Sequence, residues 1–124
     1  MKAFYAAPLT LLIMMTAPAF AACEGGLGRG WSKGQGKGEF SMSAADGQCV
    51  TGYANFYADG SSTGTPATEV ALTTAPKNGK ISIGKQGVIY TPAAGFKGKD
   101  KFCTRNTAPG VKGSLSGCIT VTVR

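Results

Sequence analysis

Hydrophobic and polar residues alternate over short runs in this chain, which is the pattern expected of β-strands. The run from Ile119 to Val123 (ITVTV) places an aliphatic residue at every second position. Residues 68–74 alternate in the same way and predict a strand with Val70 and Leu72 facing inward. Beyond the N-terminal region no segment sustains an apolar period of about 3.6 residues, so we expect little or no helix.

Turn-forming residues separate these runs at short intervals. Residues 75–79 (APKNG) predict a tight turn, because proline fixes one φ angle and Asn-Gly tolerates positive φ. Residues 80–83 and 88–91 flank Gly-Lys-Gln-Gly and predict a hairpin. Weaker strands are expected at residues 39–43 and 48–56, followed by a loop over 58–66. This succession of short strands and turns predicts an all-β protein, an antiparallel β-sandwich.

The last hairpin can be predicted in more detail. Its strands are expected over residues 101–106 and 114–123. Phe102 faces the core together with the alternating aliphatic residues, so Cys103 and Cys118 both fall on the opposite face. A register centred on the intervening turn places these two cysteines opposite each other. We therefore predict a Cys103–Cys118 disulfide across the two strands.

The N-terminal region has the pattern of a signal peptide over residues 1–21. Lys2 precedes a short apolar run, and Ala19-Phe20-Ala21 supplies small residues at the two positions that signal peptidase reads. The apolar run is too short to cross a bilayer, so no transmembrane span is expected in the mature protein. These features predict an exported protein, either periplasmic or extracellular.

A lipid anchor is the alternative interpretation of the same region. Phe20-Ala21-Ala22-Cys23 resembles a bacterial lipobox, in which the cysteine is acylated, although Phe20 replaces the usual aliphatic residue. Four cysteines instead favour two disulfides in an oxidising compartment. Cys23 and Cys49 then pair by elimination. The Cys49–Cys103 bridge of antibody domains is rejected, because no tryptophan lies between these cysteines.

Residues 22–38 are expected to form a flexible basic arm ahead of a domain over residues 39–124. Glycine occupies about every second position of EGGLGRGWSKGQGKG, and ordering so much glycine is entropically costly. Two roles are open for Trp31 in this arm. It is either a stacking or membrane-interface residue, or a side chain that folds back onto the edge of the domain.

Charge and histidine content narrow the chemistry. The chain has 13 Lys and Arg, 6 Asp and Glu and no His, which gives a formal net charge of +7. The lack of histidine excludes Ser-His-Asp and Cys-His catalysis and His-ligated metals, so we expect neither an enzyme nor a cofactor. A basic exported protein is attracted to anionic surfaces, such as lipid head groups and cell-wall polymers. We expect no specific nucleic-acid partner.

One group of basic residues has the spacing of a strand face. The candidate anion-binding residues share the parity of Cys103 or lie in the adjoining loop: Lys97, Lys99, Lys101, Arg105 and Lys112. As a functional hypothesis, they bind an anionic envelope polymer with salt-dependent affinity. The alternative is a solvated strand face, on which lysines discourage edge-to-edge pairing.

Three segments together resemble the bacterial Ig-like (cadherin-like) domains of adhesins and other surface proteins. They are residues 75–83 (APKNGKISI), 90–102 (YTPAAGFKGKDKF) and 119–123 (ITVTV), and the resemblance covers residues 66–124. It implies an Ig-like β-sandwich, present here as a single copy. The calcium sites of such domains are not expected, because the chain has only six carboxylates and no acidic run.

The matched residues also have physical roles of their own. They are Tyr90, Pro92, Gly95, Phe96, Gly98, Asp100 and Phe102. We expect Tyr90 to bury its ring and to form a hydrogen bond through its hydroxyl group. We expect Pro92 to end its strand. Phe96 should plug the end of the sandwich between Gly95 and Gly98. Asp100 shares the inward parity of Phe102 and should cap loop amides.

These observations predict an exported, non-catalytic binding or adhesion module of the bacterial cell envelope. Its expected partners are anionic polymers or lipid surfaces. The alternative is a structural or accessory subunit that docks on another envelope protein, through an exposed sheet edge.

Overall fold

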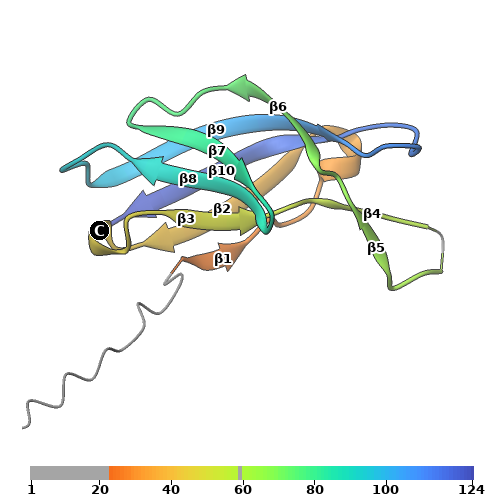
Figure 1. The fold of residues 1–124 in the computed structure, drawn as a ribbon, viewed down its shortest axis with the longest axis horizontal. Coiled ribbons are helices and arrows are strands. Elements are labelled where there is room, and N and C mark those ends of the chain that lie inside the picture. Colours follow the sequence, from red (N-terminus) through yellow and green to blue (C-terminus); the bar gives the residue numbers. More distant parts are fainter. Residues whose placement is uncertain (1–22, 59) are drawn as a thin grey trace, which may run out of the picture.

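A computed structural model describes residues 23–58 and 60–124 (Figure 1). The predicted signal peptide, residues 1–21, lies outside the described residues. Nearly all regular structure in the described part is β-strand, and its only helical elements are two 3₁₀ turns, η1 (Trp31–Lys33) and η2 (Ala44–Asp46). The expectation of an all-β fold is therefore confirmed.

The strands form two main sheets and a separate hairpin (Figure 1). The large sheet has the order β1 (Glu24–Gly26), β2 (Gly36–Met42), β10 (Leu115–Val123), β9 (Gly98–Thr107) and β6 (Glu69–Thr74). The small sheet has the order β3 (Cys49–Gly52), β8 (Gly87–Pro92) and β7 (Gly79–Gly84). The separate hairpin consists of β4 (Asn55–Tyr57) and β5 (Gly64–Pro66), and it extends away from both sheets.

The core lies between the two sheets, as in a sandwich. The large sheet contributes mainly Phe40, Met42, Phe102, Ile119, Val121 and Val123, and the small sheet contributes Cys49, Val88 and Tyr90. The rings of Tyr90 and Phe102 stack across the core with centroids 6.1 Å apart. Each sheet therefore buries the face that its alternating apolar residues define.

The two predicted hairpins and both predicted disulfides are confirmed. Cys103 lies opposite Cys118 in the β9–β10 ladder, and the two residues form a disulfide. β7 and β8 pair antiparallel up to Gly84 and Gly87. The remaining disulfide joins Cys23 to Cys49.

The glycine-rich segment is not a flexible arm, so that prediction is wrong. It forms β1, η1 and the start of β2, and β2 alternates buried and exposed residues along its length. Gly36 lies against the Trp31 ring, and Gly117 lies against Gly36, so a Cβ atom at either glycine would collide. The glycines permit close packing here, and burial of Trp31 and of the inner face of β2 offsets the entropic cost of ordering them.

Trp31 takes the second of its two expected roles. It is buried, and its Nε1–H donates a hydrogen bond to the Leu27 carbonyl oxygen at 2.6 Å. The strand that follows it also departs from the prediction of an antiparallel sandwich. β2 pairs with β10 in parallel, from Gly36 opposite Gly117 to Met42 opposite Val123.

Leu72 faces inward as predicted, but it is not buried. It pairs with Thr104, which is buried on the inner face of the large sheet, yet 44% of the Leu72 surface is exposed. The reason is position, because β6 is the last strand at one edge of the large sheet within the part of the chain that the structure describes. Residues 64–66, expected within a loop, instead pair with β4 as strand β5.

Candidate anion-binding face

The outer face of the large sheet, which points away from the core, carries most of the predicted basic residues. Lys99, Lys101 and Arg105 are exposed along β9. Their cross-strand partners on β10 are the half-buried hydroxyl residues Thr122, Thr120 and Ser116. A row of cations therefore runs beside a row of hydroxyl groups. We call this surface of β9, β10 and β2 the cationic face.

The cationic face includes one residue that the sequence pattern missed. Lys37 on β2 is exposed and lies opposite Cys118, in the same cross-strand row as Cys103. The parallel pairing of β2 with β10 places it there, and this pairing joins segments far apart in the chain. The sequence indicated only a weak alternation over residues 39–43, and nothing local indicated that the strand begins at Gly36 or which strand it pairs with.

Two carboxylates interrupt the positive charge toward the edge of the sheet. Glu39 on β2 lies opposite Thr120, and Glu24 on β1 lies opposite Ser41. Both glutamates and Lys99 line one shallow hollow of about 420 Å³. The positive potential is therefore expected to be strongest on the β9 side of the face, away from β1.

The other predicted basic residues lie at the two ends of β9. Lys97 is exposed just before the strand, and Lys112 is exposed in the loop that follows it. β9 has 10 residues, so these two lysines are about 30 Å apart. Lys97 belongs with Lys99 and Lys101, whereas the structure does not bring Lys112 close to them.

Beside β9 there is a hollow of about 540 Å³ that sequence reasoning also missed. Lys77, Lys99 and Lys101 line it together with Thr74, Ala75, Asn78, Asp100, Cys103 and Thr120. Lys77 comes from the turn between β6 and β7, which the APKNG pattern predicted correctly. Its position beside β9 depends on long-range contacts, so no local signal could have placed it near the other lysines.

Asp100 fixes that turn against β9. Its carboxylate accepts hydrogen bonds from the backbone N–H groups of Lys77, Asn78 and Lys101, each at 3.0 Å. It also accepts one from the Tyr90 hydroxyl group at 2.8 Å. The predicted role of Asp100 as a cap for loop amides is confirmed, as are the burial and the hydrogen bond of Tyr90.

Burial of the ring raises the pKa of the Tyr90 phenol above its ordinary range, and the hydrogen bond to Asp100 and its negative charge raise that pKa further. The phenol therefore stays protonated and continues to donate to the carboxylate. Asp100 lines the lysine-lined hollow, but its carboxylate already accepts four hydrogen bonds, so Asp100 and Tyr90 hold the turn in place.

The remaining motif residues shape the end of the sandwich. β8 ends at Pro92, and Phe96 is half-buried and packs against the core. Gly95 and Gly98 have φ angles of +80° and +130°, which favour glycine. Phe102 is fully buried.

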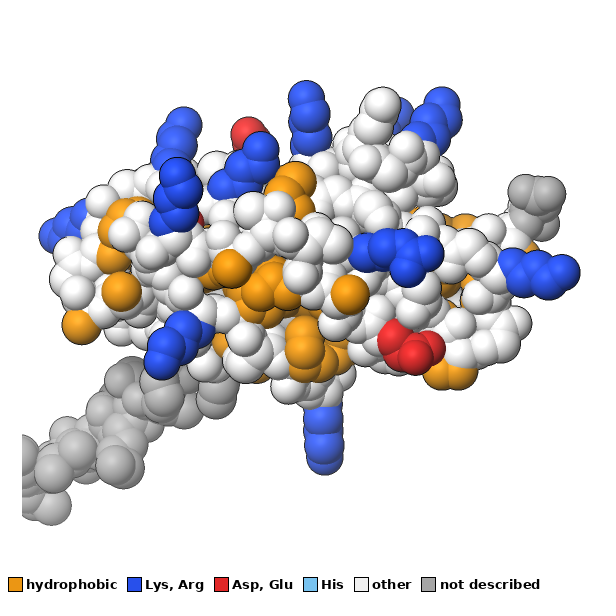
Figure 2. Space-filling model, turned by 90° about the horizontal axis from the view of Figure 1, so that it is seen from above, with side chains coloured by type: hydrophobic (Ala, Val, Ile, Leu, Met, Phe, Trp, Pro, Cys, Tyr) orange, Lys and Arg blue, Asp and Glu red, His pale blue; other side chains and the backbone are white. Residues whose placement is uncertain are grey.

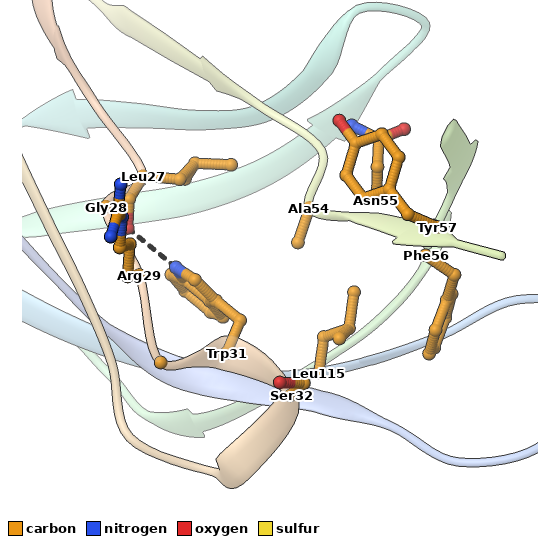
Figure 3. Close-up of a pocket in the computed structure, with 11 residues that line it drawn as sticks. Leu27, Gly28, Arg29, Trp31, Ser32, Ala54, Asn55, Phe56, Tyr57 and Leu115 are labelled. Carbon is orange, nitrogen blue, oxygen red and sulfur yellow. Dashed lines mark hydrogen bonds between the residues drawn. The ribbon is translucent and has the colours of Figure 1, made fainter. Parts of the chain in front are cut away.

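A third hollow, of about 520 Å³, lies between the η1 region and the β4 strand (Figure 3). Leu27, Trp31, Ala54 and Leu115 give it an apolar wall, and Arg29 is its one charged lining residue. The indole N–H already donates to the Leu27 carbonyl group, as the dashed line in Figure 3 shows. Ser32, Asn55 and Tyr57 also line the hollow and add polar groups to that of Arg29.

Searches against protein-family models, curated proteins and solved structures give no significant match to this chain. Within residues 23–58 and 60–124, no three His, Cys, Asp or Glu residues are grouped so that they could hold a metal ion. No helix in the described part of the chain is long and apolar enough to span a membrane.

Proposed function

We propose that this protein is an exported, non-catalytic binding module of the bacterial cell envelope, with an Ig-like β-sandwich fold. Its cationic face would dock on anionic polymers or lipid surfaces. The observation that carries this proposal is the exposed row of Lys99, Lys101 and Arg105 on β9, with Lys37 and Lys77 at its sides. Such a surface attracts polyanions, and salt weakens the attraction.

The strand order supports the Ig-like part of the proposal. An Ig-type sandwich has one sheet with strands in the order B-E-D and a second in the order C-F-G. The small sheet, β3-β8-β7, and the β6-β9-β10 part of the large sheet follow these orders if β3 is taken as strand B. The β4–β5 hairpin is then an insertion between strands B and C.

The cysteines support the exported part of the proposal. All four cysteines are paired, and none is free. Disulfides persist in oxidising compartments such as the periplasm or the extracellular space. Pairing also occupies the Cys23 thiol that acylation would require, which favours the signal peptide over the lipobox interpretation.

A second candidate function, an accessory subunit that docks on another envelope protein, rests on a different surface. β6 and β7 are edge strands of the two sheets, and Leu72 and Ile83 on them are 44% and 50% exposed. β6 lies at the top of Figure 1, and β7 is the uppermost strand of the small sheet in that view. Figure 2, viewed from above, shows hydrophobic side chains gathered along the middle, with Lys and Arg around them. An extended partner strand could pair with such an edge.

Co-sedimentation of the oxidised protein with envelope fractions, across a salt series, tests the first function. Two charge reversals, Lys99→Glu and Lys101→Glu, should lower binding at low salt by about tenfold, because several attractive charge pairs become repulsive. The matched control is Lys80→Glu with Lys85→Glu, which changes net charge equally at exposed residues of β7 and the β7–β8 turn.

The control should reduce binding less than about twofold. Equal losses in both variants would mean that net charge alone attracts the protein, and the cationic face would have no special role. No binding by the wild type at low salt would contradict the first function. Leu72→Lys would then be tested for loss of a crosslinked protein partner, which is the outcome that the second function predicts.

A further inference from the structure

We propose that the hollow lined by Lys77, Lys99 and Lys101 is a binding site for a phosphate monoester. The inference rests on the proposed function, because it names the chemical group that the cationic face would select. It goes further in assigning a particular site and in predicting a preference between anions. A purely diffuse cationic surface would show no preference beyond charge density.

The hollow exists because β6 is shorter than β9. β6 pairs with β9 only from Thr107 to Cys103, so Gly98–Phe102 pairs with no strand on that side among the described residues. At this point the chain leaves the large sheet through the turn at residues 75–78 and enters β7 in the small sheet. The turn carries Lys77 beside the uncovered part of β9, where Lys99 and Lys101 lie.

The site is held in place before any ligand arrives. The backbone N–H groups of Lys77 and Asn78 in the turn both donate to Asp100, which ties the turn to β9, and the Lys101 N–H and the Tyr90 hydroxyl group donate to the same carboxylate. Asp100 is itself only 5% exposed. A turn that is already ordered loses little entropy on binding, so the charge of Lys77 can contribute more fully to affinity.

The charges of the lining residues suit a dianion. Three lysines and one carboxylate, Asp100, line the hollow, which leaves it with two positive charges in excess. Thr74 and Thr120 also line it and add hydroxyl groups that can donate to phosphate oxygens. A phosphate monoester carries close to two negative charges near neutral pH and three acceptor oxygens. A phosphodiester or a carboxylate carries only one negative charge.

The size of the preference follows from Coulomb's law. One additional negative charge about 5 Å from two excess positive charges in water is worth roughly a tenfold change in dissociation constant. We therefore expect the monoester to bind about tenfold more tightly than a diester of similar shape. The two hydroxyl groups should widen this difference rather than create it.

The test is an NMR titration of the oxidised protein with three matched aryl anions: phenyl phosphate, methyl phenyl phosphate and benzoate. Phenyl phosphate should shift the amide signals of Lys77, Asn78 and Lys101 and saturate at about tenfold lower concentration than the others. Lys77→Gln should weaken phenyl phosphate binding about threefold or more. Lys80→Gln, at an exposed residue on the other sheet, should not change it.

Equal affinities for the three anions, or shifts outside this hollow, would overturn the proposal. The proposed function has a separate readout, because binding of envelope fractions can persist while the preference for the monoester is absent. Loss of both the binding to envelope fractions and the preference for the monoester would remove the proposed function as well. Lys77→Gln removes one charge at the margin of the face and leaves Lys99, Lys101 and Arg105 in place.

Vesicles distinguish a lipid head group from a soluble or polymer-borne phosphate. Phosphatidic acid presents a monoester and phosphatidylglycerol a diester, and phosphatidylcholine vesicles can carry either at equal surface charge. Stronger binding to phosphatidic acid, reduced by Lys77→Gln, would place the monoester on a lipid. Equal binding to both vesicles, with the preference for phenyl phosphate retained, would place it on a soluble molecule or polymer.

Discussion

The two sides of the sandwich are closed in different ways. On one side, β1 and β3 are the edge strands, and the Cys23–Cys49 disulfide joins them covalently. On the other side, β6 and β7 are the edge strands, and Leu72 and Ile83 remain half-exposed. We call these the closed side and the open side. The edges of the large and small sheets come together on both sides, so the two sides differ in the interactions that join the sheets.

The two sheets are also joined on the open side, but there by hydrogen bonds instead of a disulfide. The turn between β6 and β7 crosses from one sheet to the other, and Asp100 and Tyr90 hold it. The closed side should therefore respond to reducing agents, whereas this end of the open side should respond to pH. The surfaces proposed for binding follow the same division, because the lysine-lined hollow and the exposed apolar residues both lie toward the open side.

Removing the Cys23–Cys49 disulfide should have the largest effect on stability. Cys23→Ser with Cys49→Ser opens a crosslink between residues 26 positions apart, and we expect a loss of about 3.5 kcal/mol in the free energy of unfolding. The loss arises because the unfolded chain regains conformational freedom. β1 and the η1 region should also exchange amide hydrogens faster. Urea unfolding and hydrogen exchange measure these two effects.

The comparison variant is Cys103→Ser with Cys118→Ser. This bridge spans only 15 positions, so the loss should be slightly smaller, about 3 kcal/mol. It also joins strands that a long ladder already holds together. A loss of stability at the β9–β10 bridge that clearly exceeds the loss at the closed side would contradict this account of the closed side.

An intermediate effect on stability is expected from the ionisation of Tyr90, which donates a hydrogen bond to Asp100 on the open side. The pKa of Tyr90 is raised in the folded protein, whereas the unfolded chain ionises at the ordinary value of about 10. The contribution of Tyr90 is therefore complete below about pH 10. It is lost as the pH rises from there through the folded pKa, by up to about 1.4 kcal/mol per pH unit.

Tyr90→Phe isolates this contribution, because phenylalanine keeps the ring and cannot ionise. The difference in unfolding free energy between the wild type and Tyr90→Phe should be constant at neutral pH. It should then fall, and change sign, as the pH rises above about 10. Urea unfolding at a series of pH values measures it. A difference that stays constant up to pH 11 would show that the phenol ionises freely in the folded state.

The contrast between the two sides also explains what the sequence could predict. The β9–β10 hairpin is local, so parity and a symmetric turn were enough to give its register, its disulfide and the outward row of Lys99, Lys101 and Arg105. Likewise, the inward parity of Asp100 was enough to predict a cap for loop amides. The hairpin features depend on residues close together in the chain, whereas the two turn amides that Asp100 caps lie more than 20 positions before it, so parity predicted a cap but not which loop it holds.

The glycine-rich segment and the complete cationic face depend on contacts between distant residues. The high glycine content of residues 22–38 favoured a prediction of disorder. Composition alone does not show that Gly36 and Gly117 allow two strands to approach closely. That contact is the first pair of the parallel β2–β10 ladder, and this ladder brings Lys37 to the face. Lys77 joins the hollow only because a turn of predictable shape docks against β9.

The smallest effect is expected at the exposed apolar residues of the open side. Leu72→Thr and Ile83→Thr should each cost no more than about 0.5 kcal/mol of unfolding free energy, because both side chains already contact water. Val88→Thr is the matched control in the small sheet: Val88 pairs with Ile83 but is only 4% exposed. It should cost about 2 kcal/mol, because its hydroxyl group would be buried. Urea unfolding at low protein concentration gives all three values.

A cost near 2 kcal/mol at Leu72 or Ile83 would mean that this side is covered in solution, and concentration dependence of that cost would identify a second copy as the cover.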